Sequence, residues 1–257
     1  MNNKLFWTLR PDGTEVLRNL EEEHKNFSRE AYLRGEFDAN NYQWFEMFHH
    51  YRFDDNGCDY ERYGCYIKEG DVVLDLGGNI GIFAHRAEIR GASKVISFEP
   101  VTPTFNCLIK NRGPKTSVYK NAVGGKNGFT TFRLHTDFTH IGGGTSEDQD
   151  LLLNQRHIIH SERVIVIGIN EIFKGIDTKI NFMKIDIEGG EVDVLTAITD
   201  ENLNTLRCLS AEFHKTYDEF DEFQSNFINR MSSLGFKYFI AYYGDGNLRT
   251  LTFWKES

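Results

Sequence analysis

The segment at 72–87 carries residue types that suit ligand binding through the backbone. It reads VVLDLGGNIGIFAHRA, so an apolar run is followed by Asp75, two glycines, Asn79 and a third glycine, and then by an apolar stripe at helical spacing. A strand, a glycine-rich turn and a helix N-terminus together offer free N–H groups and a positive dipole end, without Cβ atoms that hold a ligand away. The segment therefore predicts a nucleotide-like ligand. Asp75 either fixes the turn through backbone N–H groups or faces a cationic group of that ligand.

The spacing of the glycines narrows the class of ligand. They lie at 77, 78 and 81, so the GxGxxG pattern of dinucleotide folds is not satisfied, and Asn79 stands where the second glycine would be. About 20 residues further on, KVISFEP ends in Glu99, whose carboxylate can accept hydrogen bonds from both hydroxyls of a ribose. We therefore expect an adenosine-containing ligand other than NAD, and no phosphate is required.

Acids and bases follow two further apolar runs. In MKIDIEGG, the side chains of Lys184, Asp186 and Glu188 share one face if the strand stays extended, and in SAEFH, Glu212 and His214 do the same. In open α/β folds, ligands bind beyond the carboxyl ends of the strands. We therefore expect these side chains to converge on one cleft.

The same side chains have a second interpretation, as ligands of a divalent cation. Asp186, Glu188, Glu212 and His214 form an oxygen-rich set with one histidine, which suits Mg²⁺ or Mn²⁺. We favour a site without a metal, and the metal site remains the alternative.

A parallel sheet is the element that would position these residues. From Val72 onward, apolar runs alternate with amphipathic segments, which is typical of a parallel sheet covered by helices on both faces. A helix is expected from Ile80, with Asn79 as its cap, and a second helix at 103–111. The apolar stripe of the first helix is Ile80, Phe83, Ala84 and Ala87.

The last third of the chain supplies the remaining elements. INFMKI and LRCLSAEFH are expected strands, and a helix with the capping-box pair Thr216 and Glu219 runs to Gly235. KYFIAYY and LRTLTFW, separated by GDGN, predict a β-hairpin.

Two regions lie outside this pattern. Residues 1–60 are aromatic-rich and charged with helical-looking stretches, so we expect an N-terminal helical cap ahead of one main domain at 61–257. TTFRLH and RVIVIGI are expected strands that bracket an irregular stretch at 136–162. Long loops in compact domains are usually functional or disordered, so we interpret this stretch as a mobile, substrate-side insertion. Its histidines His140, His157 and His160, with His135 just before it, are interpreted as polar loop residues in preference to substrate contacts, and they are given no catalytic role.

Composition argues against several classes of partner and site. The 257 residues include 29 Lys and Arg against 38 Asp and Glu, a net charge of -9, and no basic run, which disfavours nucleic acid as a partner. No segment approaches the length of about 18 apolar residues that a membrane span needs, so we expect no membrane insertion and a cytoplasmic location. The four cysteines form no CxxC pair and are expected to be free thiols.

Five motifs together resemble a known family. VVLDLGGNIGIFA, VISFEPVTPTFNCLIKN, NAVGG, FMKIDIEGGEVDVL and LSAEFH occur in this order, and the set resembles the FkbM-type S-adenosylmethionine-dependent O-methyltransferases over residues 70–214. The resemblance implies an α/β, Rossmann-like class I methyltransferase fold. Its seven-stranded sheet is mostly parallel with one antiparallel strand and has helices on both faces, here preceded by an N-terminal helical extension.

The resemblance also implies where S-adenosyl-L-methionine binds. It assigns a cradle for the methionine part, a holder for the ribose and a border for the adenine. The cradle is Asp75, Gly77, Gly78, Asn79 and Gly81; the ribose residues are Glu99, Pro100 and Thr102; the adenine residues are Asn121 and Ala122. Many relatives have alanine in place of Gly78.

Methyl transfer to an alcohol requires removal of a proton, and a positioned base contributes about 100 to 10,000-fold. His214 is chemically the better base at neutral pH, because the unperturbed pKa of histidine is about 6.5, whereas Asp186 matches the family better. The two are equal candidates. Glu188 and Lys184 are further catalytic candidates, and Glu212 is a candidate substrate contact. In the alternative, Glu188 caps the following helix and His214 is a structural residue.

The predicted function is methyl transfer to a hydroxyl of a small-molecule or glycan acceptor, with a sugar or glycan hydroxyl favoured. The alternatives are a polyketide-type or other small natural product, and a cofactor-binding protein without turnover. A nicotinamide oxidoreductase is disfavoured because the chain has no YxxxK pattern. A nucleic-acid amino-methyltransferase is disfavoured because the chain has no Pro-Pro-aromatic motif.

Overall fold

The computed structural model describes residues 5–9, 15–19, 58, 60–135, 143–144, 158–214, 220–243 and 248–256. Within these ranges, the central element is a seven-stranded sheet in the order β12-β13-β11-β10-β3-β4-β5. Every neighbouring pair is parallel except the two pairs that contain β13. The predicted mostly parallel sheet with one antiparallel strand is therefore confirmed, and so is the predicted hairpin. The strands are β3 (Val72–Leu76), β4 (Lys94–Phe98), β5 (Thr116–Tyr119), β10 (Phe182–Ile185), β11 (Cys208–His214), β12 (Lys237–Tyr243) and β13 (Leu248–Trp254).

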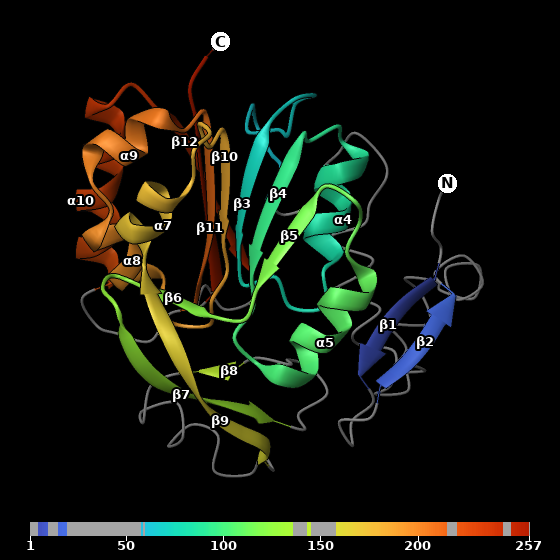
Figure 1. Cartoon of the computed structure of the whole chain (residues 1–257). Coiled ribbons are helices and arrows are strands. Elements are labelled where there is room, and N and C mark those ends of the chain that lie inside the picture. The colour runs from blue at the N-terminus through green and yellow to red at the C-terminus, as the bar shows by residue number, and fades with distance from the viewer. Residues whose placement is uncertain are drawn as a thin grey trace, which may run out of the picture.

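Helices cover both faces of this sheet, with α4 and α5 on one side and α7 to α10 on the other (Figure 1). Side chains alternate along β3, so Val73 packs in one apolar cluster with Phe83 and Phe182, and Leu74 packs in a second cluster on the other face. A strand buried on both faces reads as a continuous apolar run, as VVLDL does apart from Asp75. The helices are α4 (Ile82–Ile89), α5 (Thr102–Asn111), α7 (Ile169–Gly175), α8 (Glu191–Ala197), α9 (Asp200–Thr205) and α10 (Phe220–Ser233).

The predicted start of the first of these helices is wrong by two residues. α4 begins at Ile82, and its N-cap is Gly81, whose φ of 96° is a left-handed conformation that glycine adopts without steric cost. Asn79 is not the cap. The predicted apolar stripe is confirmed, because all four of its residues are buried. The expected capping box at 216–219 lies outside the described residues.

A second, smaller sheet lies beside the carboxyl ends of the central strands (Figure 1). Its order is β6-β9-β7-β8, and its strands are β6 (Ala122–Gly124), β7 (Gly128–His135), β8 (Gly143–Gly144) and β9 (Ile158–Gly168). The predicted end of the irregular stretch at 136–162 is wrong, because β9 already begins at Ile158 and pairs with β7 there. Most of the remaining stretch lies outside the described residues.

Two strands lie in the first 19 residues of the segment predicted as a helical cap, so the helical prediction is wrong for that part of the segment. β1 (Leu5–Leu9) and β2 (Glu15–Asn19) pair antiparallel, and residues 20–57 lie outside the described part of the chain. The sequence between the two strands includes Pro-Asp-Gly at 11–13, which is typical of a turn in a hairpin and not of a helix. Asn111 of α5 holds β1 in place: it accepts a hydrogen bond from Trp7 N at 2.7 Å and donates one to Trp7 O at 2.8 Å. Within the described ranges, no helix combines the length and apolar character of a membrane span.

Candidate cofactor and methyl-acceptor site

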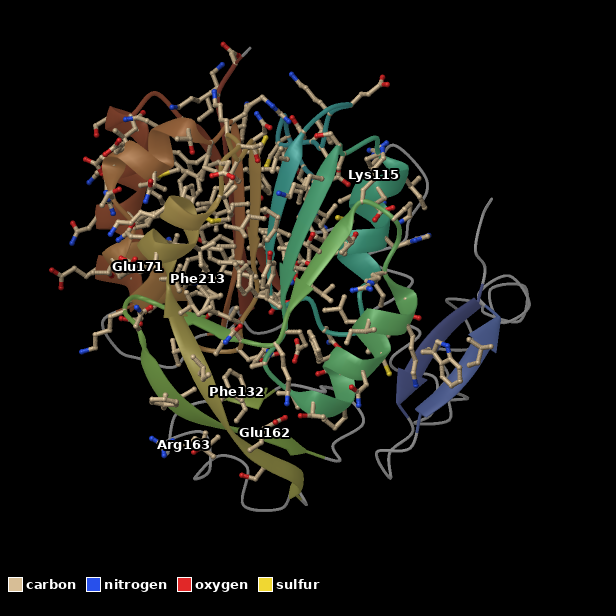
Figure 2. The ribbon with its side chains drawn as sticks, in the orientation of Figure 1. Lys115, Phe132, Glu162, Arg163, Glu171 and Phe213 are labelled. Carbon is tan, nitrogen blue, oxygen red and sulfur yellow. The ribbon has the colours of Figure 1, made fainter. Side chains whose placement is uncertain are left out.

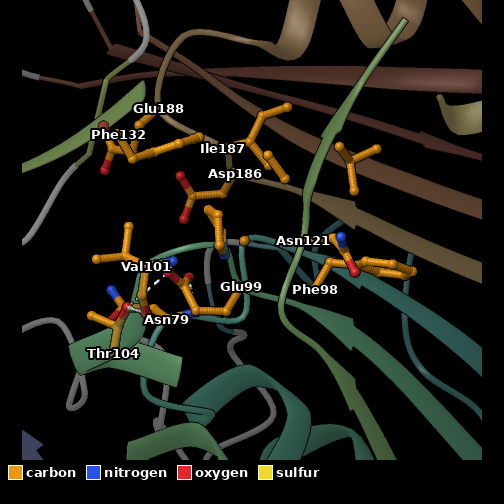
Figure 3. Close-up of a pocket in the computed structure, with 14 residues that line it drawn as sticks. Asn79, Phe98, Glu99, Val101, Thr104, Asn121, Phe132, Asp186, Ile187 and Glu188 are labelled. Atoms are coloured by element: carbon orange, nitrogen blue, oxygen red, sulfur yellow. Dashed lines mark hydrogen bonds between the residues drawn. The ribbon is translucent and has the colours of Figure 1, made fainter. Parts of the chain in front are cut away.

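A pocket lies where β3, β4 and β10 end, and the second sheet forms part of its wall (Figure 3). The empty space in and around this pocket is about 580 Å³, part of it open to solvent. Acidic groups, amides and apolar side chains from several elements meet there. The lining residues are Gly77, Asn79, Phe98, Glu99, Pro100, Val101, Thr104, Asn121, Ala122, Val123, Phe132, Asp186, Ile187 and Glu188.

The glycine turn packs tightly against neighbouring backbone. A Cβ on Gly77 would lie 1.6 Å from the carbonyl oxygen of Asp186, and one on Gly78 would lie 2.2 Å from Ser97 Oγ. Glycine is therefore required at 77 by close approach, as well as by its φ of 84°. Alanine in place of Gly78 would fit here only if Ser97 moved.

The N–H groups of this turn are not free, which corrects the expectation from sequence. Gly77 N and Gly78 N both donate to Phe98 O, at 3.0 and 2.8 Å, and Gly81 N donates to Gly78 O at 2.8 Å. Asn79 N donates to Glu99 Oε2 at 2.9 Å. The turn is folded back onto the end of β4, so these four amides shape the pocket without offering donors to an anion.

Glu99 is the acid that the turn encloses. Its Oε1 accepts hydrogen bonds from Val101 N at 2.9 Å and Thr104 Oγ1 at 2.7 Å, while its Oε2 accepts from Asn79 N (Figure 3). Burial raises the pKa of Glu99 above its ordinary value, although these donors oppose the shift. A carboxylate has about four lone-pair sites, so capacity remains for donors from a ligand.

Asp75 lies beneath the turn and does not line the pocket. Its Oδ2 accepts from Ser97 Oγ at 2.7 Å, and its Oδ1 lies 3.5 Å from Lys184 Nζ. Burial raises the pKa of Asp75, and Lys184 opposes that shift. Asp75 thus balances a cation of the protein itself, in place of the backbone contacts or the ligand cation considered from the sequence.

Lys184 is a buried support for the turn. Its Nζ donates to Gly77 O at 2.6 Å and lies 3.4 Å from Asp186 Oδ2. Burial alone would lower the pKa of Lys184, but the carboxylates of Asp186 and Asp75 prevail and raise it. A lysine that stays charged cannot take a proton, so the geometry does not favour the catalytic role considered for Lys184.

Asp186 is the acid that reaches the pocket from β10. Its side chain is 24% exposed and points into the space between Glu99 and Phe132 (Figure 3). Its Oδ2 lies 2.9 Å from the hydroxyl of Tyr60, and that hydroxyl lies 2.9 Å from Glu212 Oε2. Glu212 does not line the pocket, so its predicted contact with the substrate has no support from the geometry. Sequence reasoning missed Tyr60, which sits among other aromatic residues without helical or strand periodicity.

Glu188 lines the pocket, but not for the reason expected. The prediction needed an extended strand through 188, whereas β10 ends at Ile185 and Glu188 has a φ of 59°. The alternative, that Glu188 caps the following helix, is not what the structure shows either. The N-cap of α8 is Gly190, and no side chain forms a cap hydrogen bond there. Glu191 holds the loop ahead of the helix, because its carboxylate accepts from Ile187 N and Gly189 N at 3.0 to 3.1 Å.

The residues assigned to the nucleoside divide into two groups. Pro100, Asn121 and Ala122 line the pocket, while Thr102 does not. Thr102 is held by Glu162 of β9, which accepts from Thr102 N and, at 2.7 Å, from its Oγ1. Glu162 and Phe132 both come from the second sheet (Figure 2). Sequence reasoning missed the apolar side chains of the pocket, since no local pattern marks them: Phe98, Val101, Val123, Phe132 and Ile187.

The interpretation as a metal site concerns residues that the structure describes only in part. His214 is the last residue of β11, and its side chain lies outside the described part of the structure. Among the described residues, no group of three or more His, Cys, Asp and Glu side chains is placed to hold a metal ion. Asp186 and Glu212 do approach the same point, and the hydroxyl of Tyr60 occupies it.

Comparison with known proteins points to a single family. Residues 75–238 match the model of the family described as methyltransferase FkbM domain. The chain is 28% identical over 182 residues to the 31-O-demethyl-FK506 methyltransferase FkbM of Streptomyces tacrolimicus, covering 60% of this chain and 70% of that protein. It is 27% identical over 161 residues to the hexuronic acid methyltransferase AglP of Haloferax volcanii, covering 60% of each.

Two solved structures are also similar. Methyltransferase FkbM from Methylobacillus flagellatus KT has a TM-score of 0.48 at 14% identity, covering 84% of this chain and 50% of that one. Fibrillarin from Aeropyrum pernix, in complex with S-adenosyl-L-methionine, has a TM-score of 0.42 at 11% identity, covering 76% of this chain and 70% of that one.

Proposed function

The chain belongs to the methyltransferase FkbM domain family and is an S-adenosylmethionine-dependent methyltransferase, and from this premise we propose that it methylates a hydroxyl group of a sugar or glycan. The observation that carries the proposal is the composition of one pocket. Glu99, suited to the ribose of the cofactor, and Asp186, suited to accept a proton, line the same cavity. Proximity of cofactor and base is what a transfer between two bound molecules requires.

The described residues fit the nucleoside part of the cofactor. Ribose hydroxyls are donors, and Glu99 retains acceptor capacity after its contacts with the protein. Phe98, Val101 and Phe132 supply apolar walls for the adenine, with Asn121 and Ala122 beside them. Gly77 and Asn79 form the floor of the pocket, where a Cβ on Gly77 would collide with Asp186 O. When bound, the cofactor supplies a methyl group on a positively charged sulfur.

Asp186 is our candidate for the base. Its carboxylate faces the pocket, and a carboxylate within hydrogen-bond reach can take the proton of an acceptor hydroxyl. Lys184, 3.4 Å away, stabilises the negative charge that this role needs. His214, at the end of β11, remains the second candidate, and Glu188 is a candidate contact for the acceptor.

The relatives support two classes of acceptor. One relative is named for a hexuronic acid and another for 31-O-demethyl-FK506, so hydroxyls of sugars and of polyketide-type products are both represented. We favour the sugar hydroxyl because Glu188 and Asp186 give the pocket polar groups that can bind more than one hydroxyl.

A screen of acceptors tests this proposal. The protein is incubated with S-adenosylmethionine and matched sets of hexuronic acids, neutral sugars and polyketide-type alcohols, and products are identified by the mass increase of one methyl substitution. We expect methylation of a sugar hydroxyl. Methylation confined to polyketide-type alcohols would replace the acceptor class. Cofactor binding without transfer to any acceptor, in a preparation that binds stoichiometrically, would contradict hydroxyl transfer.

A further inference from the structure

The segment at 60–67 delivers a buried phenol to the site, although it precedes the residues that match the family model. Its anchor is Glu61, which is fully buried and forms an ion pair with Arg86 of α4. A second ion pair joins Glu61 Oε1 to Arg90 Nε at 3.4 Å. Glu61 Oε1 also accepts from Ile67 N at 2.9 Å. Breaking a buried ion pair by removing one partner is strongly destabilising, so this segment is firmly attached to α4.

Tyr60 is placed between two carboxylates. Its hydroxyl oxygen is 2.9 Å from both Asp186 Oδ2 and Glu212 Oε2, and the side chain is 1% exposed. Burial raises the pKa of Tyr60 well above its ordinary value, and the two acids raise it further, so the phenol keeps its hydrogen. A phenol has one hydrogen and can donate to one carboxylate at a time. The hydroxyl therefore donates to one carboxylate while the other lies close enough to give it a proton, so a proton can pass from one acid to the other through Tyr60.

The three groups have different access to the pocket and to solvent. Asp186 lines the pocket, Tyr60 is enclosed behind it, and Glu212 is half-buried without lining the pocket. A proton that reaches Glu212 is thus separated from the reacting atoms by the ring of Tyr60. The ring is fixed by Phe83, at an edge-to-face centroid distance of 5.6 Å, and by Lys184 Nζ, 5.2 Å from its centroid.

We propose that Tyr60 and Glu212 are positioning residues that act through Asp186, carrying away the proton that Asp186 takes from the acceptor. This inference rests on the proposed function. As the bond from the acceptor oxygen to the methyl carbon forms and the methyl–sulfur bond breaks, the hydroxyl proton passes to Asp186. Asp186 then gives a proton to the oxygen of Tyr60, while Tyr60 gives its own hydrogen to Glu212. The net change is one proton gained by Glu212, with Asp186 and Tyr60 restored.

Activity of two conservative variants tests the relay. Tyr60→Phe and Glu212→Gln should each lower turnover at least tenfold in dilute buffer, with the affinity for S-adenosylmethionine unchanged within threefold. Added imidazole buffer should restore turnover in both variants, because a small base can replace a lost proton carrier. The matched control is Tyr63→Phe, which removes a phenol that is 56% exposed. Turnover near that of the wild type, or a loss that no buffer base restores, would overturn the relay.

A measurement without turnover keeps this test separate from the proposed function. In protein labelled with ¹³C at tyrosine Cζ, the Tyr60 signal, assigned by its absence in Tyr60→Phe, should stay at its protonated position at a pH of about 10, the ordinary pKa of tyrosine. In Glu212→Gln, the Tyr60 pKa should fall, because one repelling charge is gone. A Tyr60 signal that titrates normally in the wild type would overturn the placement between two carboxylates. Failure to methylate any acceptor, with the NMR result as expected, would count against the proposed function and not against this placement.

Discussion

Glu99 and Asp186 reach the same pocket by different routes. Glu99 and the three groups that donate to it come from a stretch of about two dozen residues around the glycine turn, from Asn79 to Thr104. Asp186 receives its hydrogen bond from Tyr60, which is 126 positions away, and that phenol contacts Glu212 across 152 positions. The proposed cofactor side is thus assembled by local sequence, and the proposed acceptor side by the packing of distant segments. Changes on the first side should affect binding, and changes on the second should affect transfer.

Gly77 is where the two sides touch, so its substitution should have the largest effect. Gly77→Ala introduces a Cβ 1.6 Å from Asp186 O, and the matched control Gly235→Ala has the same φ of 84° with nothing within 4 Å. The control carries only the left-handed backbone cost of about 1–2 kcal/mol. Gly77→Ala should lose about 1–3 kcal/mol more free energy of unfolding in urea, from overpacking, and should abolish cofactor binding. Equal losses in the two variants would show that the approach of the turn to Asp186 is not tight.

Substitution of the two candidate bases should separate transfer from binding. Asp186→Asn should lower turnover at least about 100-fold, the lower end expected for a lost base, and leave the cofactor dissociation constant within threefold. His214→Ala, measured beside it under the same saturation, decides between the candidates. A 100-fold loss in His214→Ala with near-normal turnover in Asp186→Asn would assign the base to His214.

Substitution of Glu99 should have the opposite effect to substitution of Asp186, because it should weaken cofactor binding. Glu99→Ala removes the acceptor proposed for the ribose and should weaken binding of S-adenosylmethionine and its demethylated product at least tenfold, or about 1.4 kcal/mol, by calorimetry. Glu201→Ala, a change at an exposed acid of α9, is the control for net charge and should leave affinity unchanged. Unchanged affinity in Glu99→Ala would remove Glu99 from the ribose role and break the distinction between the two sides.

The smallest expected effect is the pH dependence that Glu99 confers. Burial raises the pKa of Glu99 in the folded protein above its ordinary value of 4.5. The stability contributed by protonated Glu99 is fully present below that ordinary value and is lost as pH rises through the folded pKa. Ribose hydroxyls favour the ionised acceptor, so cofactor affinity should decrease as pH falls through the folded pKa. Glu99→Gln should lose both dependences; a variant with the pH profile of the wild type would assign them to another group.

The central sheet could be predicted because a pattern of residues close in sequence indicates each of its strands and helices. Apolar runs, the stripe of α4 and the terminal hairpin all depend on residues close in sequence. Glu99 was found for the same reason, because a fixed spacing from the turn marks the end of β4. The second sheet was missed because β7 and β9 pair across a segment of more than 20 residues, and a strand does not identify its partner.

The acceptor side could not be predicted in full because its contacts are non-local. Asp186 was placed correctly at the end of a strand, but its neighbour Tyr60 lies in a segment interpreted as part of a helical cap. The prediction of free N–H groups in the glycine turn is wrong for a related reason. Their partner, Phe98 O, belongs to the next strand of the sheet, and the turn's own sequence does not show which way its amides point.

A crystal structure with the demethylated cofactor, S-adenosylhomocysteine, tests the central claim that one pocket holds the nucleoside at Glu99 and the reacting end at Asp186. We predict that the ribose hydroxyls lie about 2.5–3.0 Å from the Glu99 carboxylate, with the adenine against Phe98 and Phe132. The sulfur should face Asp186, with room between them for a hydroxyl. A ribose bound away from Glu99, or a sulfur on the side of the pocket opposite to Asp186, would contradict this account.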